Sequence, residues 1–261
     1  MAGTDKTKRA AAGGPAIILV EPQLGENIGM TARAMANFGL SRLRLVSPRD
    51  GWPSETANKA ASGADGVIEG AQVFSTLEAA VADLGLVYAT TARDRDMTKP
   101  VVGPKAAVGA ILKRQLSSED AGVLFGRERW GLTNEEIALA DEILTYPVNP
   151  AFASLNIAQA VLLFGYEWFV GFHAAEDEGP ERAGAVPLAE KAELFNLFEH
   201  LESELDQGGF LKPVEKRPKM VQNLRNILHR ASLTSQDVRT LRGVIVALTG
   251  RPFRGKERPG S

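Results

Sequence analysis

The sequence predicts an α/β protein with a mostly parallel sheet and helices on both faces, followed by a small all-helical extension. Short apolar runs rich in Val, Ile and Leu alternate with helical patterns up to about residue 170. The composition then changes to Gly, Glu, Asp and Pro, and only helical spacing returns beyond that change. Strands that alternate with helices form parallel sheets covered on both faces, and consecutive helices pack on one another.

The predicted elements follow this alternation along the chain. The runs with strand character are 16–20, 43–46, 86–90, 122–125 and 142–146. The segments with helical spacing among them are 28–38, 54–61, 77–83, 105–115, 134–140 and 155–170. In the extension, we expect helices over 188–205, 216–228 and 236–248, the last capped by Thr234 or Ser235.

These elements divide the chain into a large and a small unit. We expect a flexible tail over 1–14, an α/β domain over 15–175, a linker over 176–187, a helical domain over 188–250 and a flexible tail over 251–261. Parallel sheets bind ligands beyond the carboxyl ends of their strands, so the loops there are the candidate site. The glycine patterns of dinucleotide sites and P-loops are absent from the sequence.

The composition excludes several kinds of chemistry. The chain has 261 residues, 44% of them hydrophobic, and no cysteine, so neither a thiolate nucleophile nor a sulfur-ligated metal is available. His173, His200 and His229 lack metal-ligand spacing, and we expect them on the surface or on helix faces, with no metal bound. We find neither a secretory signal nor an apolar run of about eighteen residues, and therefore expect a cytoplasmic protein without a membrane span.

The charge is divided sharply along the chain although the net charge is only -2. Segment 176–206 holds ten acidic and two basic residues, and segment 212–261 holds twelve basic and three acidic residues. A basic segment of this kind can bind nucleic acid, or its helices can neutralise the acidic helix beside them. Charge alone leaves both explanations open.

The first motif is Asn27-Ile-Gly-Met-Thr-Ala-Arg-Ala-Met-Ala-Asn37, at the start of a predicted helix. Helical spacing turns Ile28, Ala32 and Met35 toward the core and leaves Arg33 and Asn37 pointing outward. Gly25 and Gly29 flank the helix start, where free backbone amides attract phosphate. The alternative is that Arg33 and Asn37 are only the solvated face of an amphipathic helix.

The second motif, Phe125-Gly-Arg-Glu-Arg-Trp-Gly-Leu-Thr-Asn-Glu135, follows a buried strand. Gly126 at the strand end allows the backbone to approach a ligand closely. Glu128 lies between Arg127 and Arg129, which we expect to hold it ionised. Taken alone, the segment is equally consistent with an ordinary charged loop.

The third motif is Asn149-Pro-Ala-Phe-Ala-Ser-Leu-Asn-Ile-Ala-Gln159. We expect Ser154 to cap a helix that begins at Leu155. From Ile157 to Val170 only Gln159 and Glu167 are strongly polar, so this helix is predicted to be buried and to meet a partner subunit.

In this order, the three motifs resemble those of the SpoU (TrmH/TrmJ-type) branch of the SPOUT-superfamily RNA 2′-O-methyltransferases, and the helical extension is most similar to the TrmJ subgroup. The resemblance covers roughly residues 15–170. It implies a deep trefoil knot, a homodimer formed through the knot region, and S-adenosyl-L-methionine as cofactor. The implied reaction is methylation of a ribose 2′-hydroxyl of RNA, at a cytidine or uridine of a tRNA anticodon loop.

The resemblance also implies roles for individual residues. It assigns catalysis to Arg33, Ser154 and Asn156, and structural or RNA-facing roles to Asn27, Asn37 and Glu128. The implied cofactor contacts are Thr90, Thr91, Ala92, Gly126, Tyr146, Ala153, Ser154 and Leu155. Tyr146 departs from the family, in which an aliphatic residue is common, and its contact is expected through the backbone.

The implied reaction needs mainly alignment of the hydroxyl with an electrophilic methyl group, and no metal. Because an arginine side chain is normally always protonated, we expect Arg33 to bind a phosphate and to stabilise the developing alkoxide, with a role as general base left open. Phosphate contacts are expected from segment 212–242 and from Arg93, Arg95 and Lys99.

Three alternatives remain at this point. The first is a ribosomal RNA substrate for the same reaction. The second is an RNA-binding protein that has lost catalysis on this scaffold. The third is an unrelated α/β enzyme that uses Glu128 or Glu135 as an acid or base.

Overall fold

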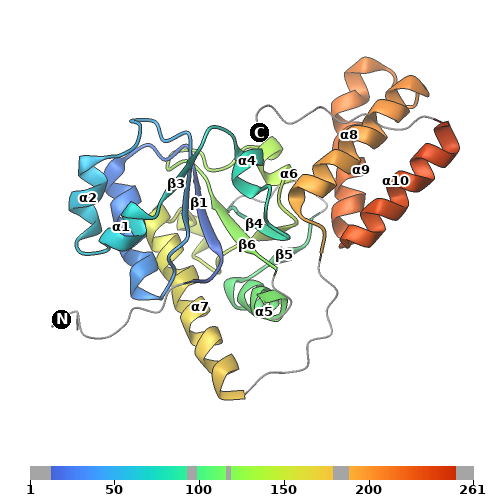
Figure 1. Cartoon of the computed structure of the whole chain (residues 1–261). Coiled ribbons are helices and arrows are strands. Elements are labelled where there is room, and N and C mark those ends of the chain that lie inside the picture. The colour runs from blue at the N-terminus through green and yellow to red at the C-terminus, as the bar shows by residue number, and fades with distance from the viewer. Residues whose placement is uncertain (1–12, 93–98, 116–118, 179–187, 251–261) are drawn as a thin grey trace.

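The computed structural model describes residues 13–92, 99–115, 119–178 and 188–250. A seven-stranded sheet in the order β3-β2-β1-β6-β4-β7-β5 forms its centre, and every strand pair in it is parallel. Helices cover both faces of the sheet, and three further helices form a separate unit at one side (Figure 1). The predicted parallel sheet with helices on both faces and the predicted helical extension are therefore confirmed.

The strands are short and mostly buried. They are β1 Ala16–Val20, β2 Leu43–Val46, β3 Gln72–Phe74, β4 Leu86–Thr90, β5 Val101–Val102, β6 Ala121–Phe125 and β7 Glu142–Leu144. Strands β3 and β5, which were not predicted, occupy the two edges of the sheet. Their edge positions leave them partly exposed, so they lack the continuous apolar run by which the central strands were recognised.

Two helical layers enclose this sheet. The helices of the α/β unit are α1 Gly25–Asn37, α2 Glu55–Ala61, α3 Asp65–Glu69, α4 Leu77–Val81, α5 Pro104–Gln115, α6 Asn134–Ala138, the 3-10 turn η1 Pro150–Phe152 and α7 Ile157–Glu178. Buried residues of α1, α3, α5 and α7 share one apolar cluster with the sheet. Those of α4 and α6 share the cluster on the opposite face. Helix α3, which has only five residues, was not predicted.

Helix α7 corrects the prediction at its start. Asn156 is the capping residue, because its Oδ1 accepts a hydrogen bond from the Ala158 amide at 2.9 Å. The helix begins at Ile157, so the predicted cap at Ser154 and start at Leu155 are wrong. Its far end lies at Glu178, beyond the predicted end at Val170. Asparagine and serine are equally good N-cap residues, so the sequence alone does not decide between Ser154 and Asn156 as the cap of α7. Tertiary contacts decide between them.

The prediction that α7 is buried holds for only one of its faces. The buried face includes Val161, Phe164 and Trp168. Five other large apolar side chains of α7 are exposed and recur at helical spacing: Leu162, Leu163, Tyr166, Phe169 and Val170. We call these five residues the α7 stripe.

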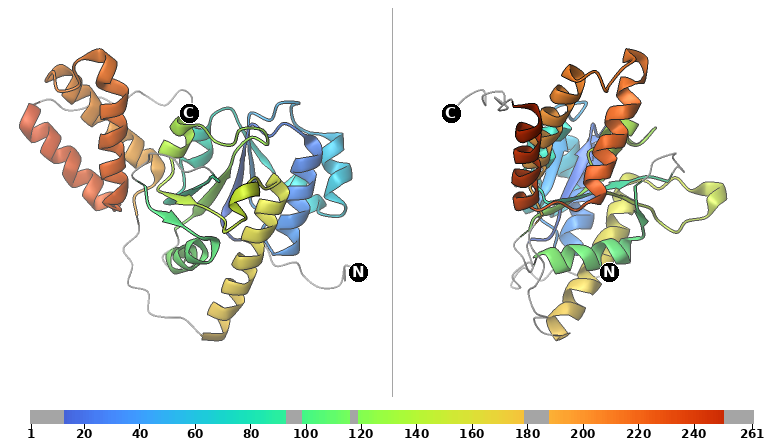
Figure 2. Two further views of the ribbon diagram at one scale, coloured as in Figure 1. Left: turned by 180° about the vertical axis from the view of Figure 1, so that it is seen from behind. Right: turned by 90° about the vertical axis from the view of Figure 1, so that its right-hand side faces the viewer.

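The extension consists of α8 Lys191–Gln207, the 3-10 turn η2 Val214–Lys216, α9 Arg217–Arg230 and α10 Ser235–Thr249. These helices lie on the side of the sheet away from α1, α2 and α7 (Figure 2). Ala189, Leu194, Leu197, Phe198 and Val238 form their own apolar core. Thr234 caps α10, as one of the two predicted candidates.

A buried charge cluster joins this unit to the sheet. The Lys191 ammonium, which is 0% exposed, pairs with the Asp141 carboxylate at the start of β7. The His229 Nδ1 lies 3.2 Å from the same carboxylate, which also accepts a 2.7 Å hydrogen bond from the Val87 amide. Burial raises the pKa of Asp141, but the charge of Lys191 and the contact with His229 outweigh it and hold that pKa well below its usual range.

Two of the three histidines lie on helix faces, one of the two predicted settings, but neither of them is at the surface. His200 and His229 are buried, because helices α8 and α9 turn them inward. Burial lowers the pKa of His229 to about 4, although the neighbouring Asp141 carboxylate opposes this shift.

The lowered pKa of His229 predicts that the free energy of unfolding decreases at acidic pH. The unfolded chain binds a proton at this histidine below its ordinary pKa of 6.5, whereas the folded chain resists protonation down to about 4. Stability is therefore lost as the pH falls through this window, by about 2 kcal/mol at pH 5 from this group. We expect thermal unfolding followed at pH 7.5 and pH 5 to show this loss. His229→Gln should reduce it, and an unchanged pH dependence in that variant would contradict the assignment.

Lys99 also differs from its predicted role. It is buried, and its Nζ donates hydrogen bonds to the carbonyl oxygens of Ala138 and Ala140. Burial lowers its pKa to about 8. Lys99 therefore holds the end of α6 and does not present its ammonium to RNA phosphate. Arg93 and Arg95, and the two predicted tails except residues 13 and 14, lie outside the described residues.

No helix in the described part of the chain is long and apolar enough to cross a membrane.

Candidate functional site

A cavity of about 420 Å³ lies beyond the carboxyl ends of β4, β6 and β7. This is the edge at which a parallel sheet is expected to bind a ligand. All the residues that the resemblance assigned to the cofactor line this cavity: Thr90, Thr91, Ala92, Gly126, Tyr146, Ala153, Ser154 and Leu155. Three segments that are far apart in the sequence therefore form one concave surface.

Ten further residues line the cavity, and the sequence had predicted a functional role for only one of them. They are Phe125, Arg127, Glu128, Arg129, Trp130, Gly131, Leu132, Val148, Ile157 and Ala160, of which only Glu128 had been assigned a candidate role. Most of them belong to the second motif or to the first turn of α7. They could therefore have been predicted from their position next to motif residues that had been assigned to the cofactor. Leu132, Ile157 and Ala160 are buried and give the cavity an apolar wall.

Two of the hydroxyl groups at the cavity, those of Thr90 and Tyr146, are engaged within the protein. The Thr90 hydroxyl donates to the Leu124 carbonyl oxygen at 2.8 Å. The Tyr146 hydroxyl donates to the Ala160 carbonyl oxygen at 2.8 Å, and burial raises the pKa of Tyr146. Both side chains therefore brace the walls of the cavity, which is consistent with a ligand contact through the Tyr146 backbone.

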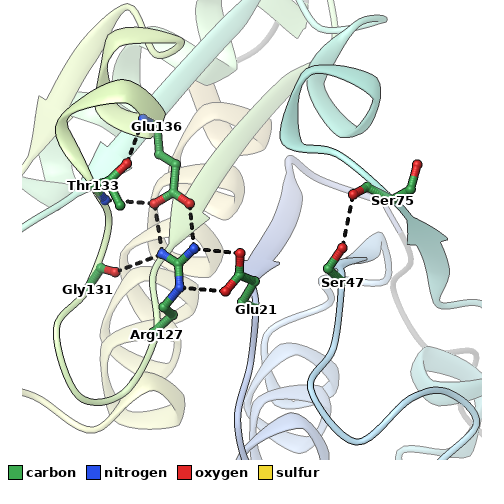
Figure 3. Close-up of polar contacts among 7 residues, drawn as sticks. All are labelled: Glu21, Ser47, Ser75, Arg127, Gly131, Thr133 and Glu136. Atoms are coloured by element: carbon green, nitrogen blue, oxygen red, sulfur yellow. Dashed lines mark hydrogen bonds and ion pairs between the residues drawn. The ribbon is translucent and has the colours of Figure 1, made fainter.

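Arg127 braces the turn formed by the second motif (Figure 3). Its Nε donates to Glu21 at 2.8 Å, and its Nη2 donates to Glu136 at 2.8 Å. Hydrogen bonds to both carboxylates raise the pKa of Arg127. Glu136 also completes the cap of α6 by accepting from the Thr133 amide at 2.7 Å. The guanidinium thus ties the end of β1 to the start of α6, a planar bidentate role that suits arginine.

Glu128 does not pair with its two arginine neighbours, and that prediction is wrong. Its carboxylate accepts hydrogen bonds from the Gln23 amide at 3.0 Å and from the Asn27 side chain at 3.0 Å. The Asn156 side chain in turn donates to Asn27 Oδ1 at 3.1 Å. We call Asn156, Asn27 and Glu128 the amide relay. It joins one residue from each motif, and it favours a structural role for Asn27 and Glu128.

The glycines at the start of α1 serve packing. A Cβ at Gly29 would lie 2.2 Å from the Ala57 carbonyl oxygen, and one at Gly25 would lie 2.0 Å from the Thr56 hydroxyl. Both glycines therefore allow α1 and α2 to approach closely. The Glu128 carboxylate occupies the entrance to α1, where the sequence analysis had expected phosphate to bind.

Arg33 and Asn37 point outward from α1, as predicted. Arg33 has no hydrogen bond or ion pair with any residue in the described ranges, and it does not line the cavity. A single chain brings Ser154 to the cavity wall and places Asn156 in the amide relay, but it does not bring Arg33 to either of them. The predicted catalytic set is therefore only partly assembled within one chain.

Two other kinds of site find little support. Glu135 is exposed on α6 and lies outside the cavity, and Glu128 is held by the α1 entrance, so neither is arranged as an acid or base. Within the described ranges, no group of three His, Asp or Glu side chains is arranged to hold a metal ion.

Comparison with known proteins gives matches over almost the whole chain. The model of the SpoU rRNA Methylase family matches residues 14–166, and that of the tRNA methyltransferase TrmJ C-terminal domain matches residues 192–258. The tRNA (cytidine/uridine-2′-O-)-methyltransferase TrmJ of Photorhabdus laumondii is 38% identical, over 88% of this chain and 94% of that protein. The crystal structure of TrmJ from Z. mobilis ZM4 is 49% identical, with a TM-score of 0.81, and the match covers 90% of this chain and 99% of that one.

Proposed function

The chain belongs to the SpoU rRNA methylase family, and on that premise we propose that it methylates the ribose 2′-hydroxyl of a tRNA anticodon-loop cytidine or uridine, with S-adenosyl-L-methionine as the methyl donor. The observation that carries this proposal is the convergence of the three motifs. The second and third line one cavity, and the amide relay ties both to the first. The relatives named TrmJ supply the substrate class and the position of the methyl group.

The cavity suits S-adenosyl-L-methionine in size and in chemistry. Its volume of about 420 Å³ lies within the usual range for small-molecule sites. Leu132, Ile157 and Ala160 offer an apolar wall for the adenine ring, and the absence of a side chain at Gly126 keeps the strand end open. The cofactor supplies an electrophilic methyl group on a cationic sulfur. The backbones of 90–92, 126 and 153–155 would hold it.

The protein then has to align a hydroxyl group and balance the charge that develops on it. Ser154 lies on the cavity wall, where its hydroxyl can bind the ribose. We assign Arg33 to the phosphate beside the target ribose and to the developing alkoxide, because a guanidinium binds both anions well. Arg33 is exposed and has no partner among the residues that the structure describes, which leaves it available for this role.

Assembly of the catalytic set requires a second copy of the chain. The α7 stripe exposes five large apolar side chains, which is unfavourable in a monomer. Phe38, at the end of the helix that carries Arg33, contacts Tyr166 and Phe169 of this stripe. A two-fold dimer that buries the stripe would bring Arg33 of one protomer toward the cavity of the other.

We also expect the chain to be knotted near this interface. The segment 145–156 contacts the loop after β4 at its start, through Thr145 and Thr91, and contacts α1 at its end, through Asn156 and Asn27.

The helical extension favours tRNA binding over mere neutralisation of charge. Arg217 and Arg225 do pair with Asp206 and Glu202 on α8, which accounts for part of the basic segment. Other cations remain exposed and lack an ion pair with described residues: Lys212, Lys216, Lys219 and Arg239. These four residues supply the surface for RNA phosphates. An enzyme that acts on tRNA is expected in the cytoplasm.

Charge reversal tests this surface. Lys216→Glu combined with Lys219→Glu should weaken tRNA binding by about tenfold and lower its salt dependence, because two phosphate contacts are lost. Cofactor affinity should not change. The matched control is Arg217→Gln, whose guanidinium is already paired with Asp206. Filter binding at several salt concentrations measures the affinity for tRNA. If the double variant and the wild type bind tRNA equally well, this surface does not bind RNA.

The proposed reaction is tested by methyl transfer. The protein is incubated with labelled S-adenosyl-L-methionine and either unmodified bulk tRNA or ribosomal RNA, and the nucleosides are then mapped. We expect label in a 2′-O-methylated cytidine or uridine of tRNA. Label found only in ribosomal RNA would show that ribosomal RNA, and not tRNA, is the substrate. Label on a base would refute methylation of the ribose. RNA binding without methyl transfer would indicate an RNA-binding protein that has lost catalysis.

A further inference from the structure

Trp130 is exposed at the rim of the cavity. Its side chain is 47% exposed although it is large and mostly apolar. Among the exposed large apolar residues of the described ranges, Trp130 alone also lines the cavity. The others lie mainly on the α7 stripe, on strand edges or in the helical extension. A tryptophan in this position has one part on the cavity wall and another part available to a second molecule.

The turn that carries Trp130 is braced from both sides. The Gly131 amide donates to the Arg127 carbonyl oxygen at 2.9 Å, and Gly131 has a φ of +72°. Arg127 is held by Glu21 and Glu136, as Figure 3 shows, and Glu128 is held at the entrance to α1. The indole is therefore displayed by an ordered turn, which reduces the entropy lost when a ligand stacks on it.

The charge beside the indole distinguishes between two possible ligands. Arg129 is exposed, and no residue in the described part of the chain forms an ion pair with it. S-adenosyl-L-methionine carries a net positive charge and a single carboxylate, so a cation at the rim favours it much less than it favours a polyanion. RNA offers both a base to stack on an aromatic ring and a phosphate to pair with an arginine. An aromatic side chain beside an unpaired arginine is thus suited to an unstacked RNA strand.

We propose, resting on the function inferred above, that Trp130 stacks on a nucleobase of the substrate RNA at the mouth of the cavity while Arg129 contacts an adjoining phosphate. Trp130 is then an RNA-binding residue that holds the unpaired nucleotide in place for transfer. Because stacking is tolerant of base identity, it favours a single-stranded loop over a duplex without selecting one base.

The test compares three variants with the wild type in steady-state kinetics on unmodified tRNA. Trp130→Ala should raise the KM for tRNA by roughly 5-fold to 100-fold, the range expected for one lost stack, with little change in kcat. Trp130→Phe keeps an aromatic face and should restore most of the affinity. Trp130→Leu keeps the bulk but not the aromatic face, so it should behave like Trp130→Ala. Val73→Ala, on an exposed edge strand away from the cavity, is the control and should match the wild type.

A second readout separates this inference from the proposed function. Cofactor affinity, measured by calorimetry, should change far less than the KM for tRNA in all variants, and it also reports that each variant is folded. Titration with tRNA should quench the fluorescence of the wild type more strongly than that of Trp130→Phe. If Trp130→Ala has an unchanged KM for tRNA and Trp130→Phe is quenched as strongly as the wild type, Trp130 does not stack on RNA. A loss of cofactor affinity without a rise in the KM for tRNA would also overturn this role. If the wild type binds tRNA but transfers no methyl group, the proposed reaction fails, and the quenching still tests the stacking.

Discussion

Replacing Arg33 with alanine is expected to lower the rate of methyl transfer at least about 100-fold, while S-adenosyl-L-methionine binds with nearly unchanged affinity. The reason is that Arg33 lies outside the cavity of its own chain and is assigned only to the RNA phosphate and the developing alkoxide. Loss of one preorganised charge partner of a transition state typically has an effect of this size. Single-turnover transfer at saturating tRNA measures the rate, and calorimetry measures the cofactor affinity.

Asn37→Ala is the matched control for this prediction, because Asn37 lies on the same exposed face of α1 without a catalytic assignment. It should retain most of the activity. Arg33→Lys should recover only part of it, since an ammonium lacks the planar fork of a guanidinium. An equal loss of methyl transfer and of cofactor affinity in Arg33→Ala would mean that Arg33 has been assigned to the wrong role.

Replacing Gly126 with alanine is expected to lower cofactor affinity at least about tenfold and to lower methyl transfer with it. A Cβ at Gly126 would lie 2.3 Å from the Gly131 carbonyl carbon and 2.3 Å from the Leu132 amide nitrogen. These are backbone atoms of the braced turn, so they cannot move aside as a flexible side chain would. The turn has to shift, and with it one wall of the cavity.

Gly109→Ala provides the control for Gly126→Ala. Gly109 lies within α5, and a Cβ there would meet no atom within 4 Å. The substitution should leave cofactor binding unchanged and stabilise the fold by about 0.5–1 kcal/mol, since alanine favours the helix. Full cofactor affinity in Gly126→Ala would show that the cofactor binds elsewhere.

The elements that the sequence predicted well are those that depend on local pattern. The buried central strands and the amphipathic helices follow from apolar spacing, and the loops at the strand ends follow from the strand directions. Eight of the lining residues and Glu128 were identified because motif spacing and resemblance pointed to the same loops. The two edge strands and helix α3 escaped, because their burial depends on neighbours that the local sequence does not specify.

The errors concern polar partners that are distant in sequence. Glu128 was expected to pair with adjacent arginines, yet it pairs with Gln23 and Asn27 across a separation of about one hundred residues. Lys99 was assigned to solvent, yet it binds carbonyl groups about forty residues away. A charged residue in a loop looks the same in the sequence whether it meets RNA or a buried carbonyl, and only the fold distinguishes the two.

The central claim is that the cavity of one protomer and Arg33 of the other form one catalytic site. It is tested most directly with a purified heterodimer of an Arg33→Ala chain and a Gly126→Ala chain, assayed at a cofactor concentration at which both homodimers have lost nearly all activity. In that heterodimer one intact cavity faces one intact Arg33. The account predicts methyl transfer to tRNA at about half the rate of the wild-type dimer. A heterodimer as inactive as both parents would contradict it.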